Sequence, residues 1–303
     1  MPVIGLLLCS LIGWMQPQQP AGTRPVFVTA SFLDRNRLYV ENLGRDEIRI
    51  FENDQPREVQ YMAGREVPMV YGLLFDPYVL PQLFEEPGRD SYGVSIATAA
   101  GNVAYQVMDQ AFVGQSGWLG TYGDDLQVNV DFVPDSGRIK DALQMLAVER
   151  LSREPSLYTA LFTAAKKMSR RNEKRRILIL FIEVLDSRTG DRLKALKNLL
   201  GSSNIELFVA SFTRSRLPGD HGMPLAKSEA SLRELADATA GAAYFTPRET
   251  IEGMGRRISY QISSFYTVGF ESTSTIDKPG KLRIECTRPN VKVTTHNMVP
   301  VLQ

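Results

Sequence analysis

The chain has 303 residues, of which 43% are hydrophobic and 23% are charged, and this ordinary composition excludes a disordered, collagen-like or coiled-coil protein. Its 35 Lys and Arg residues stand against 34 Asp and Glu residues, and the formal net charge of +1 excludes a global field that would hold nucleic acid or an anionic membrane. Two cysteines, Cys9 and Cys286, and two histidines, His221 and His296, are too few for a Cys/His zinc cluster or a disulfide framework.

The amino terminus carries the pattern of an export signal. Residues 2–15 form an apolar run too short to span a bilayer comfortably, and residues 16–22 are polar and small. We interpret residues 1–22 as a signal peptide cut near Ala21, although the first basic residue, Arg24, follows the apolar run instead of preceding it. A retained membrane anchor and a buried strand are the alternatives. Removal of Cys9 would leave one cysteine and therefore no internal disulfide.

Residues 23–66 predict a short antiparallel β segment. Alternating apolar residues, separated by Asn, Asp, Gly and Pro, occupy four runs, residues 26–34, 37–43, 47–53 and 54–62. Residues 265–303 return to this pattern, with strands expected at 266–272, 281–287 and 291–295. Because neither segment has enough strands to hide an apolar face alone, we expect the two to pair with each other beside the rest of the protein.

The intervening residues 67–264 predict an α/β domain. Three continuous apolar runs, residues 68–75, 177–182 and 205–212, are typical of parallel strands buried on both faces. Residues 121–133 predict a strand or hairpin before a helix that Asp135 or Ser136 caps. Helical periodicity fills the remainder, at residues 95–112, 139–152, 156–169, 192–200, 227–240 and 250–264. This alternation predicts a doubly wound, mostly parallel sheet flanked by the small β segment.

Several stretches resemble, in order, the VWFA-related domain family of the acidobacterial type, exported proteins built around a von Willebrand factor A domain. The resemblance covers residues 25–297 and is carried by VPMVYGLLFD, SLYTALFTAAKKM, RRILILFIEVLD, ELADATAGAAYF and SSFYTVGFEST. It implies a von Willebrand A or Rossmann-like fold for residues 67–264 and a role in adhesion-like protein binding. Family resemblance supports fold more firmly than function.

The resemblance also implies a cation site at the carboxyl ends of the central strands, whose residues this sequence has largely lost. The family pattern is Asp-x-Ser-x-Ser after the first strand, a Thr before the third helix and an Asp after the fourth strand. Here the five positions are Asp76, Tyr78, Leu80, Pro155 and Glu183. Since the hydroxyl ligands are missing and Mg²⁺ requires octahedral oxygen ligands, we interpret the site as vestigial, with no metal and no cofactor. A functional Mg²⁺ or Mn²⁺ site is the alternative.

In the vestigial interpretation Asp76 and Glu183 form a pair of acids at neighbouring strand ends, with Asp186 three residues after Glu183. Loop amides or the cation of Arg188 would then cap them. The same acids are the only general acid and base that a hydrolase could use here. The sequence offers no Gly-x-Ser-x-Gly elbow, phosphate-binding loop, His-Glu-x-x-His motif or dinucleotide fingerprint. His221 lies in a Gly/Pro-rich stretch and is interpreted as a surface histidine.

Aromatic residues predicted in loops above the strand ends are candidates for partner binding, namely Tyr78, Phe84, Trp118 and Tyr122. Such anchors carry much of the energy of an interface. The alternative for Trp118 and Tyr122 is that they pack onto the sheet. Residues 166–176 hold seven basic residues, which we interpret as a solvated helix end, with an anion or sulfated-polysaccharide patch as the alternative.

The sequence therefore predicts an exported, non-catalytic interaction module that binds a protein or envelope component without a metal. A Mg²⁺-dependent adhesion module and a carboxylate-based hydrolase are the alternatives. Nucleic acid is not expected as a partner, because no aromatic residues are interleaved with the charges of residues 166–176. Contact with a membrane is expected only through the signal peptide or a retained anchor.

Overall fold

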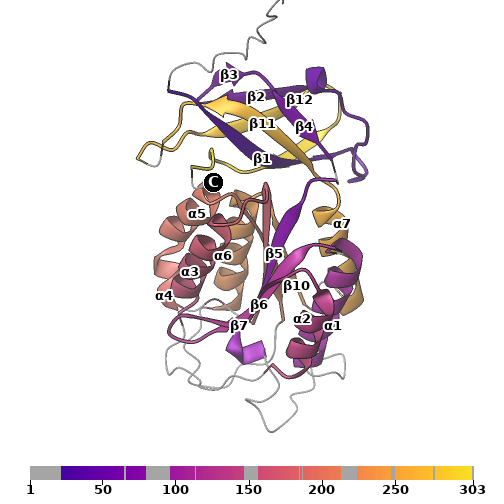
Figure 1. Cartoon of the computed structure of the whole chain (residues 1–303), viewed down its shortest axis with the longest axis vertical. Coiled ribbons are helices and arrows are strands. Elements are labelled where there is room, and N and C mark those ends of the chain that lie inside the picture. The colour runs from indigo at the N-terminus through magenta and orange to yellow at the C-terminus, as the bar shows by residue number, and fades with distance from the viewer. Residues whose placement is uncertain are drawn as a thin grey trace, which may run out of the picture.

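Two stacked units make up the molecule in this computed structural model, a β-sandwich and an α/β unit (Figure 1). The structure describes residues 22–64, 66–79, 96–112, 114–146, 156–183, 185, 187–212, 224–246, 250–275 and 277–301. The sandwich is built from the two ends of the chain, and the α/β unit from its middle. The sandwich lies against one end of the central sheet, and η2 (Pro77–Val79), which follows the first central strand, lies at the opposite end.

The central sheet has six strands in the order β10-β9-β8-β5-β6-β7. Every neighbouring pair is parallel except β6 and β7, which form a hairpin. Its second strand lies within residues 121–133, where a strand or hairpin was predicted, whereas most of its first strand precedes that range. The middle strands are continuous apolar runs buried along their whole length, as parallel strands covered on both faces require. The strands are β5 (Met69–Phe75), β6 (Ser116–Tyr122), β7 (Leu126–Val133), β8 (Arg175–Ile182), β9 (Ile205–Ser211) and β10 (Ala242–Phe245).

Helices cover both faces of this sheet, so the prediction of a doubly wound α/β unit is confirmed. One face packs on α1 (Ile96–Ala111), α2 (Ser136–Gln144) and α7 (Ile251–Ile262). The other face packs on α3 (Leu157–Ser169), α5 (Leu193–Ser202) and α6 (Leu225–Ala238), while the short α4 (Ser187–Asp191) follows β8. Helix starts follow side-chain capping: Asp135 accepts the N–H of Gly137 at 2.8 Å, as predicted for α2, and Ser156 caps α3.

The sandwich confirms that the first and last β segments pair with each other. Its inner sheet has the order β13-β1-β11-β4 and its outer sheet the order β12-β2-β3. Alternate residues of both sheets, among them Val28, Ile50 and Val268, form a separate apolar core. The strands are β1 (Arg24–Leu33), β2 (Ile48–Glu52), β3 (Gln55–Arg57), β4 (Tyr61–Ala63), β11 (Tyr266–Ser272), β12 (Leu282–Cys286) and β13 (Lys292–Thr295).

Three local predictions were wrong. The strand expected at residues 37–43 is a turn with a single bridge, because the Asp34 carboxylate accepts the N–H groups of Asn36 and Leu38 and Arg37 has a φ of 63°. The strand expected at residues 54–62 is split between β3 and β4, which belong to different sheets. The helix expected at residues 139–152 begins earlier and ends at Gln144, and residues 147–152 lie outside the described part.

Candidate functional site

The two acids predicted at the strand ends do lie on neighbouring strands. Asp76 follows β5 and Glu183 follows β8, and these strands are parallel neighbours with Phe75 opposite Phe181. The ladder continues one step further, because the Asp76 N–H donates to the carbonyl of Phe181 at 2.8 Å. Both acids are buried, with 2% and 5% of their surface exposed. The parallel register therefore brings two groups of the same charge to one buried edge of the sheet.

Hydroxyl groups near this edge bind backbone atoms. The Ser211 hydroxyl donates to the carbonyl of Glu183 at 3.0 Å. The Ser228 hydroxyl accepts the N–H of Leu185 at 2.7 Å, and the Thr189 hydroxyl accepts the N–H of Tyr158 at 3.1 Å. These bonds hold together the ends of β8 and β9 and the starts of α3, α4 and α6. They serve loop geometry, which is a structural role for the serine and threonine side chains of this region.

Two of the five positions of the implied cation site have described side chains, Asp76 and Glu183. Asp76 and Glu183 are the carboxylates at the two strand ends, and the described ranges contain no group of three or more His, Cys, Asp or Glu residues able to hold a metal. Tyr78 lies in η2, but its side chain is outside the described part of the chain. Leu80, Phe84, Pro155, Asp186, His221 and the side chain of Arg188 are also outside it. The vestigial interpretation therefore stays a prediction from the sequence, which has Tyr78, Leu80 and Pro155 at the hydroxyl positions.

The predicted loop that carries Trp118 and Tyr122 is a strand, which corrects their assignment as partner-binding residues. Both belong to β6, and their side chains are 0% and 4% exposed, so neither presents a surface to a partner. Trp118 fits because its neighbour across the sheet is Gly72: a Cβ at residue 72 would lie 2.4 Å from the indole ring. The packing alternative is therefore the one that the structure supports.

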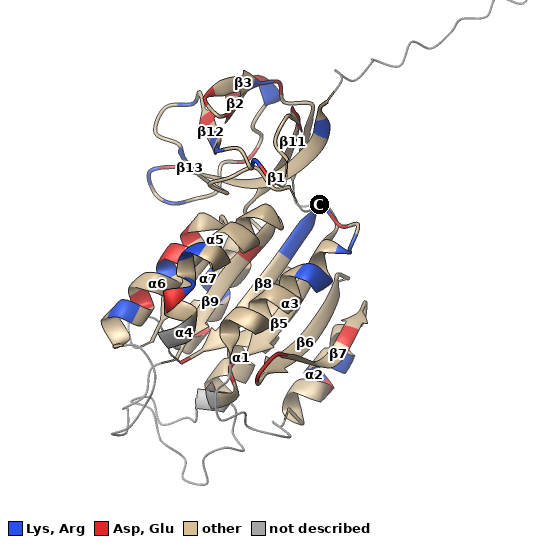
Figure 2. Ribbon diagram, turned by 90° about the vertical axis from the view of Figure 1, so that its left-hand side faces the viewer, with Lys and Arg blue, Asp and Glu red and all other residues tan. Residues whose placement is uncertain are grey.

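The basic run at residues 166–176 is largely used inside the protein. Lys167 pairs with Asp131 at 2.5 Å, and Arg171 pairs with Glu173. Arg176 is buried and donates to the carbonyls of Met168 and Arg171, while Arg175 is buried at the start of β8. The blue start of β8 lies directly under the sandwich (Figure 2). Most of the run therefore stabilises the junction of α3 and β8. The prediction of a solvated helix end is wrong for Arg175 and Arg176, which are buried.

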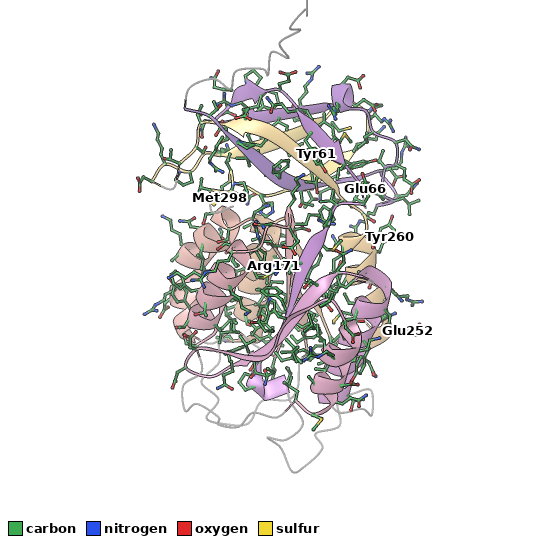
Figure 3. All side chains as sticks on the ribbon, in the orientation of Figure 1. Tyr61, Glu66, Arg171, Glu252, Tyr260 and Met298 are labelled. Atoms are coloured by element: carbon green, nitrogen blue, oxygen red, sulfur yellow. The ribbon has the colours of Figure 1, made fainter. Side chains whose placement is uncertain are left out.

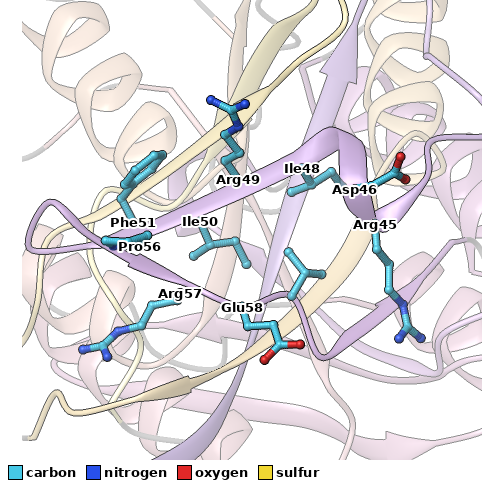
Figure 4. A pocket seen from close by; sticks show the side chains of 10 residues that line it. Arg45, Asp46, Ile48, Arg49, Ile50, Phe51, Pro56, Arg57 and Glu58 are labelled. Carbon is cyan, nitrogen blue, oxygen red and sulfur yellow. The ribbon is translucent and has the colours of Figure 1, made fainter.

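A groove on the outer sheet of the sandwich was not predicted from the sequence (Figure 4). The groove encloses about 290 Å³ and opens where the chain leaves β3 for β4. Its wall is apolar at Ile48, Ile50 and Val59, and charged side chains of both signs surround it, Arg45, Asp46, Arg49, Arg57 and Glu58. The split of residues 54–62 between two sheets creates it, and a single-strand prediction could not anticipate that split.

No protein-family model matches this chain, and no curated protein sequence does. The solved structures to which it is similar include von Willebrand factor A domains and BatB proteins. A von Willebrand factor type A protein from Catenulispora acidiphila has 10% identity and a TM-score of 0.47, over 94% of this chain and 75% of that one. BatB from Bacteroides thetaiotaomicron has 14% identity and a TM-score of 0.48, over 65% of this chain and 97% of that one.

A third similar structure is the proximal thread matrix protein 1 of the mussel byssus, whose metal-ion-dependent adhesion motif holds zinc. It has 10% identity and a TM-score of 0.49, over 70% of this chain and 50% of that one. Likeness of this degree concerns the arrangement of elements and does not transfer a ligand. By its own sheet order and helix layers, the chain is a mixed α/β protein with a mostly parallel six-stranded sheet. None of its described helices is long and apolar enough to cross a membrane.

Proposed function

We propose that this protein is an exported, non-catalytic interaction module that binds a protein or envelope partner through the strand-end face, without a metal. The observation that carries the proposal is the pair of buried acids at the ends of β5 and β8, whose neighbouring hydroxyls bind backbone atoms. The sandwich lies at the opposite end of the sheet and does not cover the strand-end face. The family resemblance of the sequence supports an adhesion-like role.

The contacts proposed for the partner are Tyr78, three residues after the end of β5, and Phe84. Trp118 and Tyr122 are withdrawn as contacts because the sheet buries them. Aromatic side chains are suited to this role, since a few buried anchors carry most of the energy of an interface. Export is proposed from residues 1–22, which carry the apolar run and the small-residue exit.

The test is capture of partners from the native envelope fraction by the tagged mature chain, with and without chelator. We expect one set of partners to be retained equally in both conditions and to be lost in Tyr78→Ala. The matched control is Leu38→Ala, an apolar side chain that is 57% exposed and follows β1 of the sandwich, at the other end of the central sheet. Capture that chelator abolishes would establish the Mg²⁺-dependent alternative. Capture that Leu38→Ala abolishes and Tyr78→Ala preserves would move the binding face to the sandwich.

A further inference from the structure

A buried polar layer separates the sandwich from the α/β unit. The inner sheet turns its apolar residues toward the sandwich core and its small polar residues, Thr29, Ser31 and Thr267, toward the start of β8 and β9. All three are at most 1% exposed. His296, which follows β13, is fully buried in the same layer and forms a single β-bridge with Thr239 at the end of α6. We call these residues, together with Arg175 and Glu206, the junction layer.

One ion pair anchors the junction layer. The Arg175 guanidinium donates two hydrogen bonds to the Glu206 carboxylate, from Nε to Oε1 at 3.0 Å and from Nη2 to Oε2 at 2.9 Å. The Thr29 hydroxyl donates to the same Oε1 at 2.7 Å, which ties the sandwich to the pair. Arg175 also donates to the carbonyl of Ile262 at the end of α7, at 3.1 Å. Both charges are therefore fully engaged, as buried charges must be.

The buried ring of His296 has no such hydrogen bonds. Neither ring nitrogen has a hydrogen-bond partner among the described residues, and the same holds for the hydroxyls of Ser31 and Thr267. The charged groups that neighbouring elements bring to the junction are Glu206 of β9, Arg175 of β8 bound to it, Lys174, which lies over the rings of Phe27 and Tyr61, and Glu271 of β11, which is on the same side of its strand as Thr267. Of these, Glu206 is the one that acts on the pKa of His296. Residue 239 and the nearby residues of β1 bring neutral hydroxyls. A proton added to His296 would thus enter a buried site whose nearest carboxylate is already committed to Arg175.

Each unit keeps its own apolar core on its own side of this layer. The sandwich core and the two cores of the α/β sheet share no residue. The main chain crosses between the units at residues 64–68 and 263–265, and the final segment returns along the helices, where Asn297 donates its N–H to Ala238 and Met298 lies against Gly201 (Figure 3). Separation of the units would break the contacts of the polar junction layer, together with the contact of Lys174 with the rings of Phe27 and Tyr61.

We propose that the junction layer is an acid-sensitive joint: the contact between the sandwich and the α/β unit opens as the pH falls below neutrality, while both units stay folded. Opening would free the sandwich to turn relative to the strand-end face. The opened form exposes the His296 ring to water, where it takes up a proton without the cost of burial. The closed form requires the neutral ring.

The direction of the pH effect follows from linkage. Burial lowers the pKa of His296 from its ordinary 6.5 to about 4, against a smaller opposing effect of the Glu206 charge. The closed joint therefore has its full stability above pH 6.5 and loses it as the pH falls toward 4. Because one proton is linked to opening, the ratio of opened to closed molecules rises about tenfold per pH unit within this window.

The histidine content makes the test simple, since the chain holds two histidines, His221 and His296. Proton NMR of the mature chain follows both imidazole signals from about pH 7.5 downward, and His221→Gln assigns them by elimination. We expect the His296 signal to titrate well below the His221 signal. Amide signals of β1, β11 and β13 should change together with it, while those of β5, in the centre of the other unit, should stay. In His296→Gln the amide changes should disappear, and in His221→Gln they should persist.

Three results would overturn the proposal. A His296 signal that titrates at an ordinary value with unchanged junction amides would show that the layer is not linked to protonation. Loss of β5 signals at the same midpoint as those of β1 would show global unfolding instead of a joint. Amide changes that persist in His296→Gln would assign the acid response to another group. If His296→Gln does not fold, the two imidazole titrations and the amide signals of the wild-type chain decide on their own.

Discussion

The two ends of β8 differ in the signs of the buried charges found there. At its start Arg175 meets Glu206 in a two-bond ion pair, and Thr29 of the sandwich completes the acceptor. Its end is followed by the buried acid Glu183, and the neighbouring parallel strand β5 is followed by a second buried acid, Asp76. The start is thus a contact between charges of opposite sign, whereas at the other end two neighbouring strands are each followed by an acid. We infer that selection for folding explains the first end, and that the second end is the place to look for a ligand or partner.

The largest effect that can sharpen this comparison is expected from Trp118→Ala. The indole is fully buried against Gly72, so its removal should cost about 4 kcal/mol of unfolding free energy through lost contacts and a cavity. Urea denaturation measures the loss. The control, Leu38→Ala at a 57% exposed site, should change stability by less than ~0.5 kcal/mol. A small loss in Trp118→Ala, together with lost partner capture, would restore Trp118 to the binding face.

Arg175→Met should follow with a loss of about 3 kcal/mol, because it leaves the Glu206 carboxylate buried without its cation. Urea denaturation again provides the measurement. The matched control is Lys197→Met, which breaks the exposed pair with Glu234, 2.6 Å apart, and should cost less than ~1 kcal/mol. The double variant Arg175→Met with Glu206→Leu should recover part of the loss, since no buried charge then lacks a partner. Equal losses in Arg175→Met and Lys197→Met would remove the contrast between the two ends of β8.

Much of the fold could be predicted because buried strands and helices have characteristic patterns of apolar residues in the sequence. The runs at residues 68–75, 177–182 and 205–212 are typical of strands covered on both faces, and they are β5, β8 and β9. The predictions failed where a local side-chain bond or a change of sheet decided the backbone. Asp34 closes a turn that the alternation of residues 37–43 concealed, and the departure of the chain from β3 is a tertiary event.

The site was less predictable, for a related reason. The strand-end position of Asp76 and Glu183 followed from the strands themselves, whereas the burial of Trp118 depended on a glycine on another strand. The junction layer was missed altogether. Three features of the sequence correspond to it: Arg175 and Arg176 precede an apolar run, Glu206 interrupts another, and Thr29 lies among apolar neighbours. A charge inside an apolar strand implies a partner, but the sequence could not say which residue that partner was.

A smaller effect is expected from Asp76→Asn at the other end of β8. The amide keeps the shape of the side chain and removes one of two neighbouring like charges, so the unfolding free energy should change by less than ~1 kcal/mol. Glu206→Gln is the comparator at the junction, where loss of the charge leaves Arg175 without its partner and should cost clearly more. Urea denaturation of both variants measures the difference. If Asp76→Asn costs as much as Glu206→Gln, the strand-end acids are held by cationic or donor groups as firmly as the junction pair.

The smallest effect is expected from divalent cations. A site with a Kd near 1 mM would gain only about 0.4 kcal/mol from Mg²⁺ at that concentration, which corresponds to about 1–2 °C in Tm. We expect a shift below this limit on adding Mg²⁺ or Mn²⁺, and none on adding chelator, because the sequence has Tyr78, Leu80 and Pro155 at the hydroxyl positions of the implied site. Scanning calorimetry and isothermal titration of the wild-type chain and of Asp76→Asn measure this. Tighter binding that Asp76→Asn abolishes would show that a cation binds at the two acids. The two ends of β8 would then differ in what balances the buried charge. A protein side chain would balance it at the start, and a metal ion at the end.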